Sequence, residues 1–182
     1  MKTFGRASVS VAHEHGVDLS LEGGAGFAIQ VLEPSMLRVR YKPTNGYREP
    51  RTWAIAPQAG EDVAWSGRQR DDASGFSFPK AQVVAAQPGQ VTLRTSALSV
   101  TVKEDPLCLS WQDSQGQALF SDRVTSAYFA SQRTGATRHY VQRDRAERYY
   151  GLGDKTGPLD LHGRRLRTLG ITDQSPIKRS LR

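Results

Sequence analysis

Apolar and polar residues alternate over a long stretch in the middle of the chain. Between Ala81 and Asp122, short runs rich in Val, Leu and Thr are separated by Pro-Gly, Thr-Ser, Glu-Asp-Pro and Asp-Ser-Gln-Gly. Such runs between turn residues are typical of short antiparallel strands. The pattern predicts five strands with one buried face. The side chains expected in the core are Val91, Leu93, Val100, Val102, Leu107, Leu109 and Trp111.

The first half of the chain predicts further strands. Two apolar runs, 27–32 and 36–41, flank Pro34, which cannot continue a strand ladder, so a hairpin is expected. Residues 46–78 are rich in Gly, Pro and charged pairs and predict loops around a short strand at 53–56. No apolar stripe of helical period persists for three turns, so we expect little helix. These patterns predict an all-β chain, a large antiparallel β-sandwich, folded as a single domain over residues 1–182.

The positive charge of the chain is concentrated at its C-terminal end. The chain carries +7 overall, while residues 1–132 hold 13 basic and 13 acidic residues and residues 133–182 hold 12 basic and 5 acidic ones. The C-terminal segment lacks a dense Lys/Arg stripe with interleaved aromatic residues, which nucleic-acid binding would need. We therefore expect a solvated or interface face and no nucleic-acid partner.

Hydropathy, the N-terminal stretch and the cysteine count indicate where the protein is located and which sites it can form. No window approaches the roughly 18 apolar residues of a membrane span, so no membrane partner is expected. The N-terminal stretch reaches His13, Glu14 and His15 instead of an apolar signal core, and we expect a cytoplasmic location. The single cysteine, Cys108, excludes an intrachain disulfide and a thiolate metal cage, and it is expected to be a small buried hydrophobe.

The glycine-rich stretch "ERYYGLGDKTGPLDLHGRR", residues 147–165, raises the question of phosphate binding. A P-loop needs glycine directly before Lys-Ser/Thr and a helix behind it, but Asp154 occupies that position and Pro158 follows Gly157. The glycine spacing also fails the dinucleotide-binding fingerprint. Both nucleotide interpretations are therefore set aside, and no cofactor is expected.

Acid–base and metal chemistry are also weakly indicated. Asp154, Asp160 and Asp173 are carboxylates of the type that glycosidases use in pairs, but Asp154 and Asp160 sit where turn carboxylates accept backbone N–H bonds. The four histidines, His13, His15, His139 and His162, share no motif, and we expect no metal site. No Gly-x-Ser-x-Gly nucleophile elbow is present.

The stretch "ERYYGLGDKTGPLDLHGRRLRTLGITD" resembles the end of the N-terminal β-sandwich domain of glycoside hydrolase family 31, the α-glucosidase and α-xylosidase family. Upstream, "MLRVRYKP", "WAIAP" and "ALSVTVKEDPLCLSWQDSQGQALFSD" resemble that domain's strands in order. Two positions depart from the family pattern: Asp154 replaces the usual Glu, and "LGIT" stands where an aromatic-Asn pair normally precedes the final Asp.

The resemblance implies a galactose-mutarotase-like supersandwich from which a loop reaches over a catalytic (β/α)₈ barrel. Asp173 matches the loop aspartate that contacts substrate, and Ser175 falls where some members carry a hydroxyl group. The structural motif at the base of this loop is Gly151, Gly153, Asp154 and Gly157. Glycine there permits a positive φ angle and close backbone approach at the turn that aims the loop.

We expect no catalytic barrel within these 182 residues, because a barrel takes roughly 250 residues and the loop lies close to residue 182. In the family both catalytic carboxylates belong to the barrel, so no residue here is expected to be catalytic and the 182 residues alone should be inactive. We therefore expect the accessory N-terminal domain of a retaining α-glycosidase, with the barrel in the same polypeptide and an α-linked sugar as substrate. Residues 151–182 would be a glycine-rich loop, a short strand and a mobile tail leading into the barrel, since "QSPIKRSLR" offers only Ile177 and Leu181 for burial.

Two other functions stay open. One is a stand-alone, non-catalytic β-sandwich that binds carbohydrate or another protein. The other is a mutarotase-like epimerase, which needs a general acid and a general base beside a sugar ring. The epimerase is the weaker alternative, because no arrangement of His and Glu is legible in the sequence.

Overall fold

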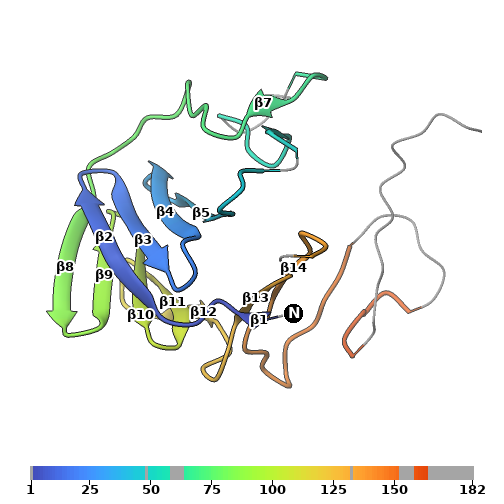
Figure 1. Cartoon of the computed structure of the whole chain (residues 1–182). Helices are drawn as coiled ribbons and strands as arrows, with labels where there is room; N and C mark the ends of the chain where they lie inside the picture. Colours follow the sequence, from blue (N-terminus) through green and yellow to red (C-terminus); the bar gives the residue numbers. More distant parts are fainter. Residues whose placement is uncertain (1, 48, 58–63, 132, 152–157, 164–182) are drawn as a thin grey trace, which may run out of the picture. The chain divides into compact units, whose positions relative to one another are not determined.

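The computed structural model describes residues 2–47, 49–57, 64–131, 133–151 and 158–163 (Figure 1). The chain divides into two compact units, Met1–Gln142 and Arg143–Arg182. All strands of the described residues belong to the first unit. The expected mobile tail, residues 174–182, lies outside the described residues.

One large sheet of the first unit is built by the N-terminal part of the chain. It contains β2 (Ala7–His13), β3 (Gly16–Leu21), β4 (Gly26–Glu33) and β5 (Met36–Lys42), in the order β2-β3-β4-β5 with antiparallel neighbours. The predicted hairpin around Pro34 is confirmed, and Ile29 lies opposite Val39 across it. The turn into β3 requires glycine at position 16, because a Cβ atom there would lie 2.1 Å from the Ile29 carbonyl oxygen.

The second large sheet contains the five strands predicted from the alternating pattern. These are β8 (Gln82–Gln87), β9 (Gln90–Arg94), β10 (Leu98–Glu104), β11 (Leu107–Asp113) and β12 (Ala118–Ser121). They form one antiparallel sheet in sequence order, β12-β11-β10-β9-β8. Each connection is therefore a short turn between neighbouring strands, as the breaker residues predict.

Two small sheets complete the first unit. One contains β1 (Lys2–Thr3), β13 (Tyr128–Ala130) and β14 (Thr137–His139), in the order β1-β13-β14. The other pairs β6 (Arg51–Thr52) with β7 (Arg68–Gln69). The expected strand at 53–56 is wrong, because the Thr52 hydroxyl accepts the Ala54 N–H at 3.2 Å and the chain turns there.

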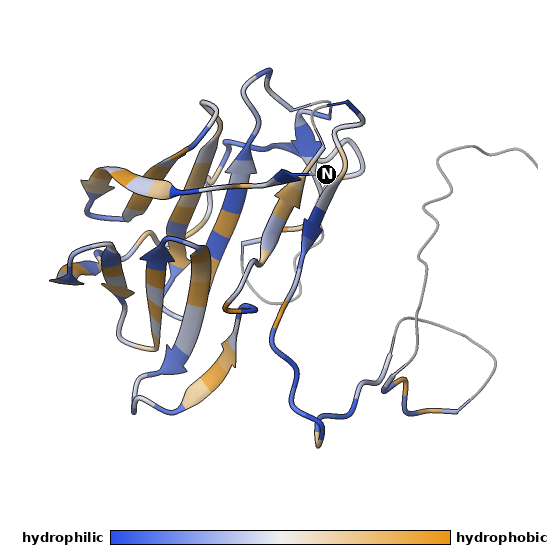
Figure 2. Cartoon of the chain, turned by 60° about the horizontal axis from the view of Figure 1, so that its bottom comes forward, coloured by the Kyte–Doolittle hydropathy of each residue, from blue (hydrophilic) through white to orange (hydrophobic). Residues whose placement is uncertain are grey.

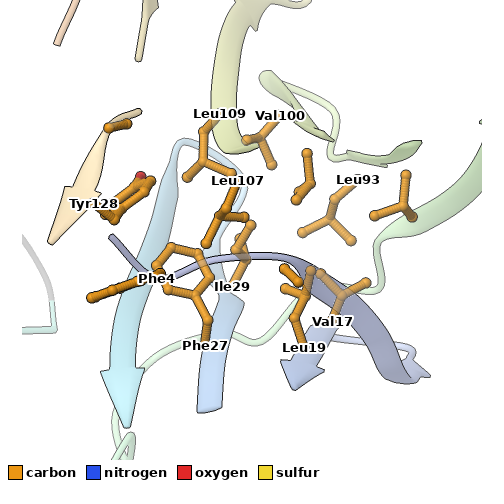
Figure 3. Close-up of a cluster of buried hydrophobic side chains, with 14 of the residues drawn as sticks. Phe4, Val17, Leu19, Phe27, Ile29, Leu93, Val100, Leu107, Leu109 and Tyr128 are labelled. Atoms are coloured by element: carbon orange, nitrogen blue, oxygen red, sulfur yellow. The ribbon is translucent and has the colours of Figure 1, made fainter. Parts of the chain in front are cut away.

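The core lies between the inner faces of the two large sheets. Figure 2 shows the alternation of apolar and polar positions along their strands, and Figure 3 shows the side chains that meet between them. All seven side chains predicted to be buried are between 0% and 8% exposed. Residues of β3 and β4 contribute the opposing layer, led by Val17, Leu19, Phe27 and Ile29. This arrangement confirms an all-β sandwich.

Helix is absent from the part of the chain that the structure describes. It follows that these residues contain no helix with the length and apolarity to cross a membrane.

Truncating one core side chain tests the importance of this layer. Leu93→Ala should lower the free energy of unfolding by about 2 to 5 kcal/mol, because it removes buried methyl groups and leaves a cavity. The control is Val11→Ala on β2, where the side chain is 53% exposed and the change should stay within about 0.5 kcal/mol. Urea unfolding followed by tryptophan fluorescence measures both. Equal losses in the two variants would contradict the assigned inner face.

Candidate functional site

The stretch that resembles the family loop begins with a turn closed by Asp160. Its Oδ1 atom accepts the N–H of His162 at 2.9 Å and the N–H of Tyr149 at 3.4 Å. Arg148 Nε lies 3.4 Å from the other carboxylate oxygen, and Leu161 N–H donates to the Tyr149 carbonyl at 2.7 Å. Asp160 therefore ties two segments of this turn together. Its predicted role as a turn carboxylate is confirmed.

The same contacts decide the protonation of Asp160. The His162 N–H that bonds to the carboxylate is the main cause that lowers the pKa of Asp160, and the Tyr149 N–H and the charge of Arg148 add to it. Hydrogen bonds to the ionised form stabilise that form. Asp160 is therefore an ionised acceptor at neutral pH and is unsuited to act as a general acid.

Tyr149 and His162 complete the turn. The Tyr149 hydroxyl donates to the Glu147 carboxylate, which raises the pKa of Tyr149. His162 Nδ1 lies 2.6 Å from the Glu147 carbonyl oxygen, so the ring N–H donates there. The His162 ring also stacks with the Tyr149 ring at a centroid distance of 6.2 Å. These contacts fix the turn.

The glycine motif and the substrate loop are described only in part. Gly151 has a φ angle of +98°, which L-residues with side chains rarely adopt, so the expectation of a positive φ angle is confirmed at this position. Gly153, Asp154 and Gly157 lie outside the described residues. Asp173 and Ser175 also lie outside them, and their assignment as substrate-binding residues stays a prediction.

The first unit contains an aromatic cavity of about 300 Å³. Its walls come from both large sheets and from the small sheet of β13 and β14. The lining residues are Phe4, Phe27, Val39, Tyr41, Leu109, Trp111, Phe120, Tyr128, Thr137, Arg138 and His139. Trp111 and Phe120 stack at 5.4 Å, and Phe4 stacks on Tyr41 at 4.5 Å. Most of the wall is aromatic or aliphatic, which favours apolar groups over free charges.

A buried carboxylate bonds to two residues that line this aromatic cavity, Leu109 and His139. Asp122, directly after β12, is 1% exposed, and its Oδ2 atom accepts the Leu109 N–H at 2.9 Å. Its Oδ1 atom lies 2.7 Å from His139 Nε2. The His139 ring stacks on Tyr128 at 4.6 Å with an interplanar angle of 6°. Asp122 therefore joins β11 of the five-stranded sheet to β14 of the small sheet.

The contacts of Asp122, His139 and Tyr128 limit the acid–base chemistry that these three side chains can perform. Burial, followed by the nearby Asp122 carboxylate, raises the pKa of Tyr128, so its hydroxyl stays protonated at neutral pH. Both oxygens of Asp122 are already engaged, and only His139, with 44% of its side chain exposed, reaches solvent. An epimerase needs an acid and a base on either side of the sugar ring. The geometry fits a packing role better than proton transfer.

The sequence does not reveal the pair of Asp122 and His139. The two residues are 17 positions apart and lie in separate short strands or at their ends, so neither spacing nor periodicity connects them. His13 ends β2 and His15 lies in the turn after it, where the backbone N–H of His15 donates to His13 Nδ1 at 3.3 Å. No group of three or more metal-ligating side chains occurs in the described ranges.

Cys108 is 8% exposed on β11, which confirms it as a buried small hydrophobe. Burial raises the pKa of the Cys108 thiol and so lowers the fraction of reactive thiolate. A nucleophilic role is therefore disfavoured.

Comparison with known proteins gives a consistent family match. The family of glycosyl hydrolase 31 N-terminal galactose mutarotase-like domains matches residues 26–173. None of the curated proteins matches the chain.

Two solved structures are similar to this chain. A GH31 dextranase of Flavobacterium johnsoniae, solved with glucose, has 18% identity and a TM-score of 0.67 over 90% of this chain and 18% of its own. A GH31 alpha-xylosidase of Xanthomonas citri has 21% identity and a TM-score of 0.56 over 84% of this chain and 16% of its own. The chain thus spans less than a fifth of either protein.

Protonation of Asp160 should loosen the turn that it closes. Because the pKa of Asp160 is lowered from its ordinary value of 3.8, the stabilisation is present above that value and is lost as pH falls through the folded-state pKa. Hydrogen exchange should therefore show a lower protection factor for the His162 amide at about pH 2 than at about pH 6. In Asp160→Ala, which removes the acceptor oxygen, the protection should be low at both pH values. Unchanged protection in this variant would contradict the assigned role.

Removal of the buried carboxylate should weaken the first unit. Asp122→Ala leaves the buried Leu109 N–H without its side-chain acceptor and His139 without its partner, at an expected cost of about 2 to 4 kcal/mol. The control is Asp144→Ala, which removes a single exposed contact to Ala146 N–H and should cost less than about 1 kcal/mol. Urea unfolding measures the free energy of unfolding of both variants. Similar losses would show that the contacts of Asp122 between β11 and β14 contribute no more to stability than an exposed hydrogen bond.

Proposed function

Since this chain belongs to the family of glycosyl hydrolase 31 N-terminal galactose mutarotase-like domains, we propose that it is the accessory N-terminal domain of a retaining α-glycosidase. The parent enzyme would be of the α-glucosidase or α-xylosidase type. Its catalytic (β/α)₈ barrel would follow in the same polypeptide. The domain would add one loop to the substrate pocket of that barrel.

The observation that carries this proposal is the reach of the family match. It runs to residue 173 and so includes the loop aspartate together with the sandwich. The two similar structures are glycosidases in which a region like this chain occupies less than a fifth of the length. The remainder of such a chain leaves ample room for a barrel of roughly 250 residues.

The chemistry would be divided between the two domains. In a retaining glycosidase, a nucleophile and an acid/base carboxylate about 5 Å apart form and hydrolyse a covalent glycosyl intermediate. Both groups would come from the barrel. Asp173 would accept hydrogen bonds from hydroxyl groups of the sugar, and Ser175 would add a neutral contact beside it. Such contacts position the substrate and strengthen as the transition state forms.

The turn closed by Asp160 would anchor the start of the loop. Asp160, ionised and bonded to the N–H groups of His162 and Tyr149, closes this turn 13 residues before Asp173 in the sequence. Gly151 supports the tight backbone path at its start. When the turn at the start of a loop is held firmly, less conformational entropy is lost as the loop positions its functional side chain.

The proposal is tested by removing the charge of the loop aspartate in the parent enzyme. In the protein in which this chain is joined to its barrel, Asp173→Asn should lower kcat/KM for an aryl α-glycoside by about 10- to 100-fold, because a hydrogen bond to a charged group is lost. Glu33→Gln, at the end of β4, serves as the matched control and should leave kcat/KM unchanged. An Asp173→Asn enzyme with full activity would contradict the contribution to the pocket.

The 182-residue chain alone provides the second arm of this experiment. It should show no turnover of aryl α-glucosides or α-xylosides. Turnover that persists through purification and disappears in Asp173→Asn would place the chemistry in this chain and overturn the division of labour.

A further inference from the structure

Arginine side chains organise the segment between β5 and β8. In the described residues of this segment the regular structure is the short pair β6–β7 (Figure 1). Guanidinium groups bind several of its backbone carbonyls. The donor and carbonyl pairs are Arg40 to Arg70 at 3.0 Å, Arg51 to Gly67 at 2.7 Å, Arg68 to Ser74 at 2.6 Å, and Arg70 to Glu49 at 2.6 Å. These four arginines have a clear structural use.

Arg38 departs from this pattern. Arg38 and Arg40 are two residues apart on β5, so they share its outer face while Val39 between them packs against the core. Two residues along a strand span only about 7 Å, which brings two positive charges close together. Arg40 has an ion pair with Asp71 and a carbonyl partner, but the structure gives Arg38 no ion pair and no carbonyl partner within the described ranges.

Three buried donors around this position have no hydrogen-bond partner in the described part of the chain. They are Arg38 Nη1, Arg40 Nε and Tyr47 Oη, and Arg68 Nε on β7 is a fourth such donor in the same segment. Arg70 covers the ring of Tyr47, with its guanidinium carbon 4.9 Å from the ring centre, which links it to the same group. We call Arg38, Arg40, Tyr47 and Arg70 the arginine cluster. Buried donors are nearly always satisfied, so three unsatisfied ones in one cluster require an explanation.

The charge of the arginine cluster is also unbalanced. It holds three guanidinium groups, and the one carboxylate paired with them in the described residues is Asp71, whose side chain is 83% exposed. Arg68 nearby is already paired with Asp72 at 3.4 Å. Burial, followed by the charge of Arg40, lowers the pKa of Arg38, yet arginine keeps its proton in proteins. An uncompensated cation therefore remains.

We propose that the arginine cluster is an oxyanion-binding site that takes a phosphate, sulfate or carboxylate group, with Arg38 Nη1, Arg40 Nε and Tyr47 Oη as donors. Such a group supplies several acceptor oxygens and negative charge together, and guanidinium forks bind it strongly. A water molecule would satisfy the donors but would leave the positive charge uncompensated. The ligand is either a free inorganic anion or the acidic group of a sugar. This site goes beyond the proposed function, which concerns a neutral α-linked sugar.

Thermal unfolding of the 182-residue chain tests the proposal. Sodium phosphate, sodium sulfate and sodium glucuronate are each titrated against sodium chloride at matched ionic strength, so that general screening cancels. A ligand that binds only the folded state should raise Tm by about 5 to 10 °C at roughly 100 times its Kd. Arg38→Met should abolish this shift. The matched control Arg94→Met, at an exposed position on β9, should keep it.

Two further measurements keep the test decisive. Tyr47→Phe removes one donor but keeps the ring beneath Arg70, and it should weaken the apparent affinity by about tenfold. Without any anion, Arg38→Met should unfold at the same or a higher temperature than the unaltered chain, because a buried unpaired charge is removed.

The pattern of ligands identifies the source of the oxyanion. A shift with glucuronate that glucose does not produce supports an acidic sugar, while a shift with phosphate or sulfate alone supports an inorganic anion or a phosphorylated or sulfated ligand. The proposal is overturned by the absence of any shift, or by equal shifts in Arg38→Met and Arg94→Met. A lower Tm of anion-free Arg38→Met than of the unaltered chain would also overturn it, since the charge of Arg38 would then be compensated by the chain itself.

Discussion

Burial of alternate side chains between two antiparallel sheets is the interaction on which the rest of this molecule depends. Val17, Leu19 and Ile29 from one sheet meet Leu93 and Val100 from the other, and all are at most 2% exposed. Because side chains alternate across each strand, this inner layer also determines which residues point outward. Arg38 and Arg40 occupy the outer face of β5 for this reason, since Leu37 and Val39 face the core. The apolar layer therefore places Arg38 and Arg40 of the arginine cluster on the outer face.

Polar contacts link the small sheet to this layer at one end. Phe4 N–H donates to the Tyr128 carbonyl at 3.2 Å, and the Phe4 ring stacks on Tyr41. Asp122 accepts the Leu109 N–H and binds His139, so the same region is also joined to β11. A buried carboxylate is costly unless its oxygens are bonded, and here both are. The aromatic cavity lies among these contacts as a part of the architecture, and its apolar wall is better suited to packing than to acid–base chemistry.

Regular strands could be predicted from the sequence, while contacts between distant side chains could not. The five strands from Gln82 to Ser121 and the hairpin at Pro34 repeat a local pattern, and each step of it is visible in the residues themselves. The strand expected at 53–56 failed because the hydroxyl of Thr52 turns the backbone, a local bond that competes with strand pairing. Asp160 could be recognised as a turn carboxylate because one of the N–H donors that it accepts from, that of His162, is only two residues away in the chain. Asp122 with His139, and Arg38 with Tyr47, depend on the folded arrangement and leave no periodic signal.

The physical domain begins before the segment that carries the family match. The match starts at residue 26, but β2 and β3, which form half of the four-stranded sheet, lie within residues 7–21. β3 pairs with β4 over five of its six residues, from Gly16 opposite Gln30 to Ser20 opposite Gly26. Val17 and Leu19 also fill the core beside Phe27 and Ile29. Without these strands, β4 would become an edge with unpaired N–H and C=O groups, and its apolar face would lose part of its cover. The residues that precede the match are therefore required for the sandwich that supports the proposed loop.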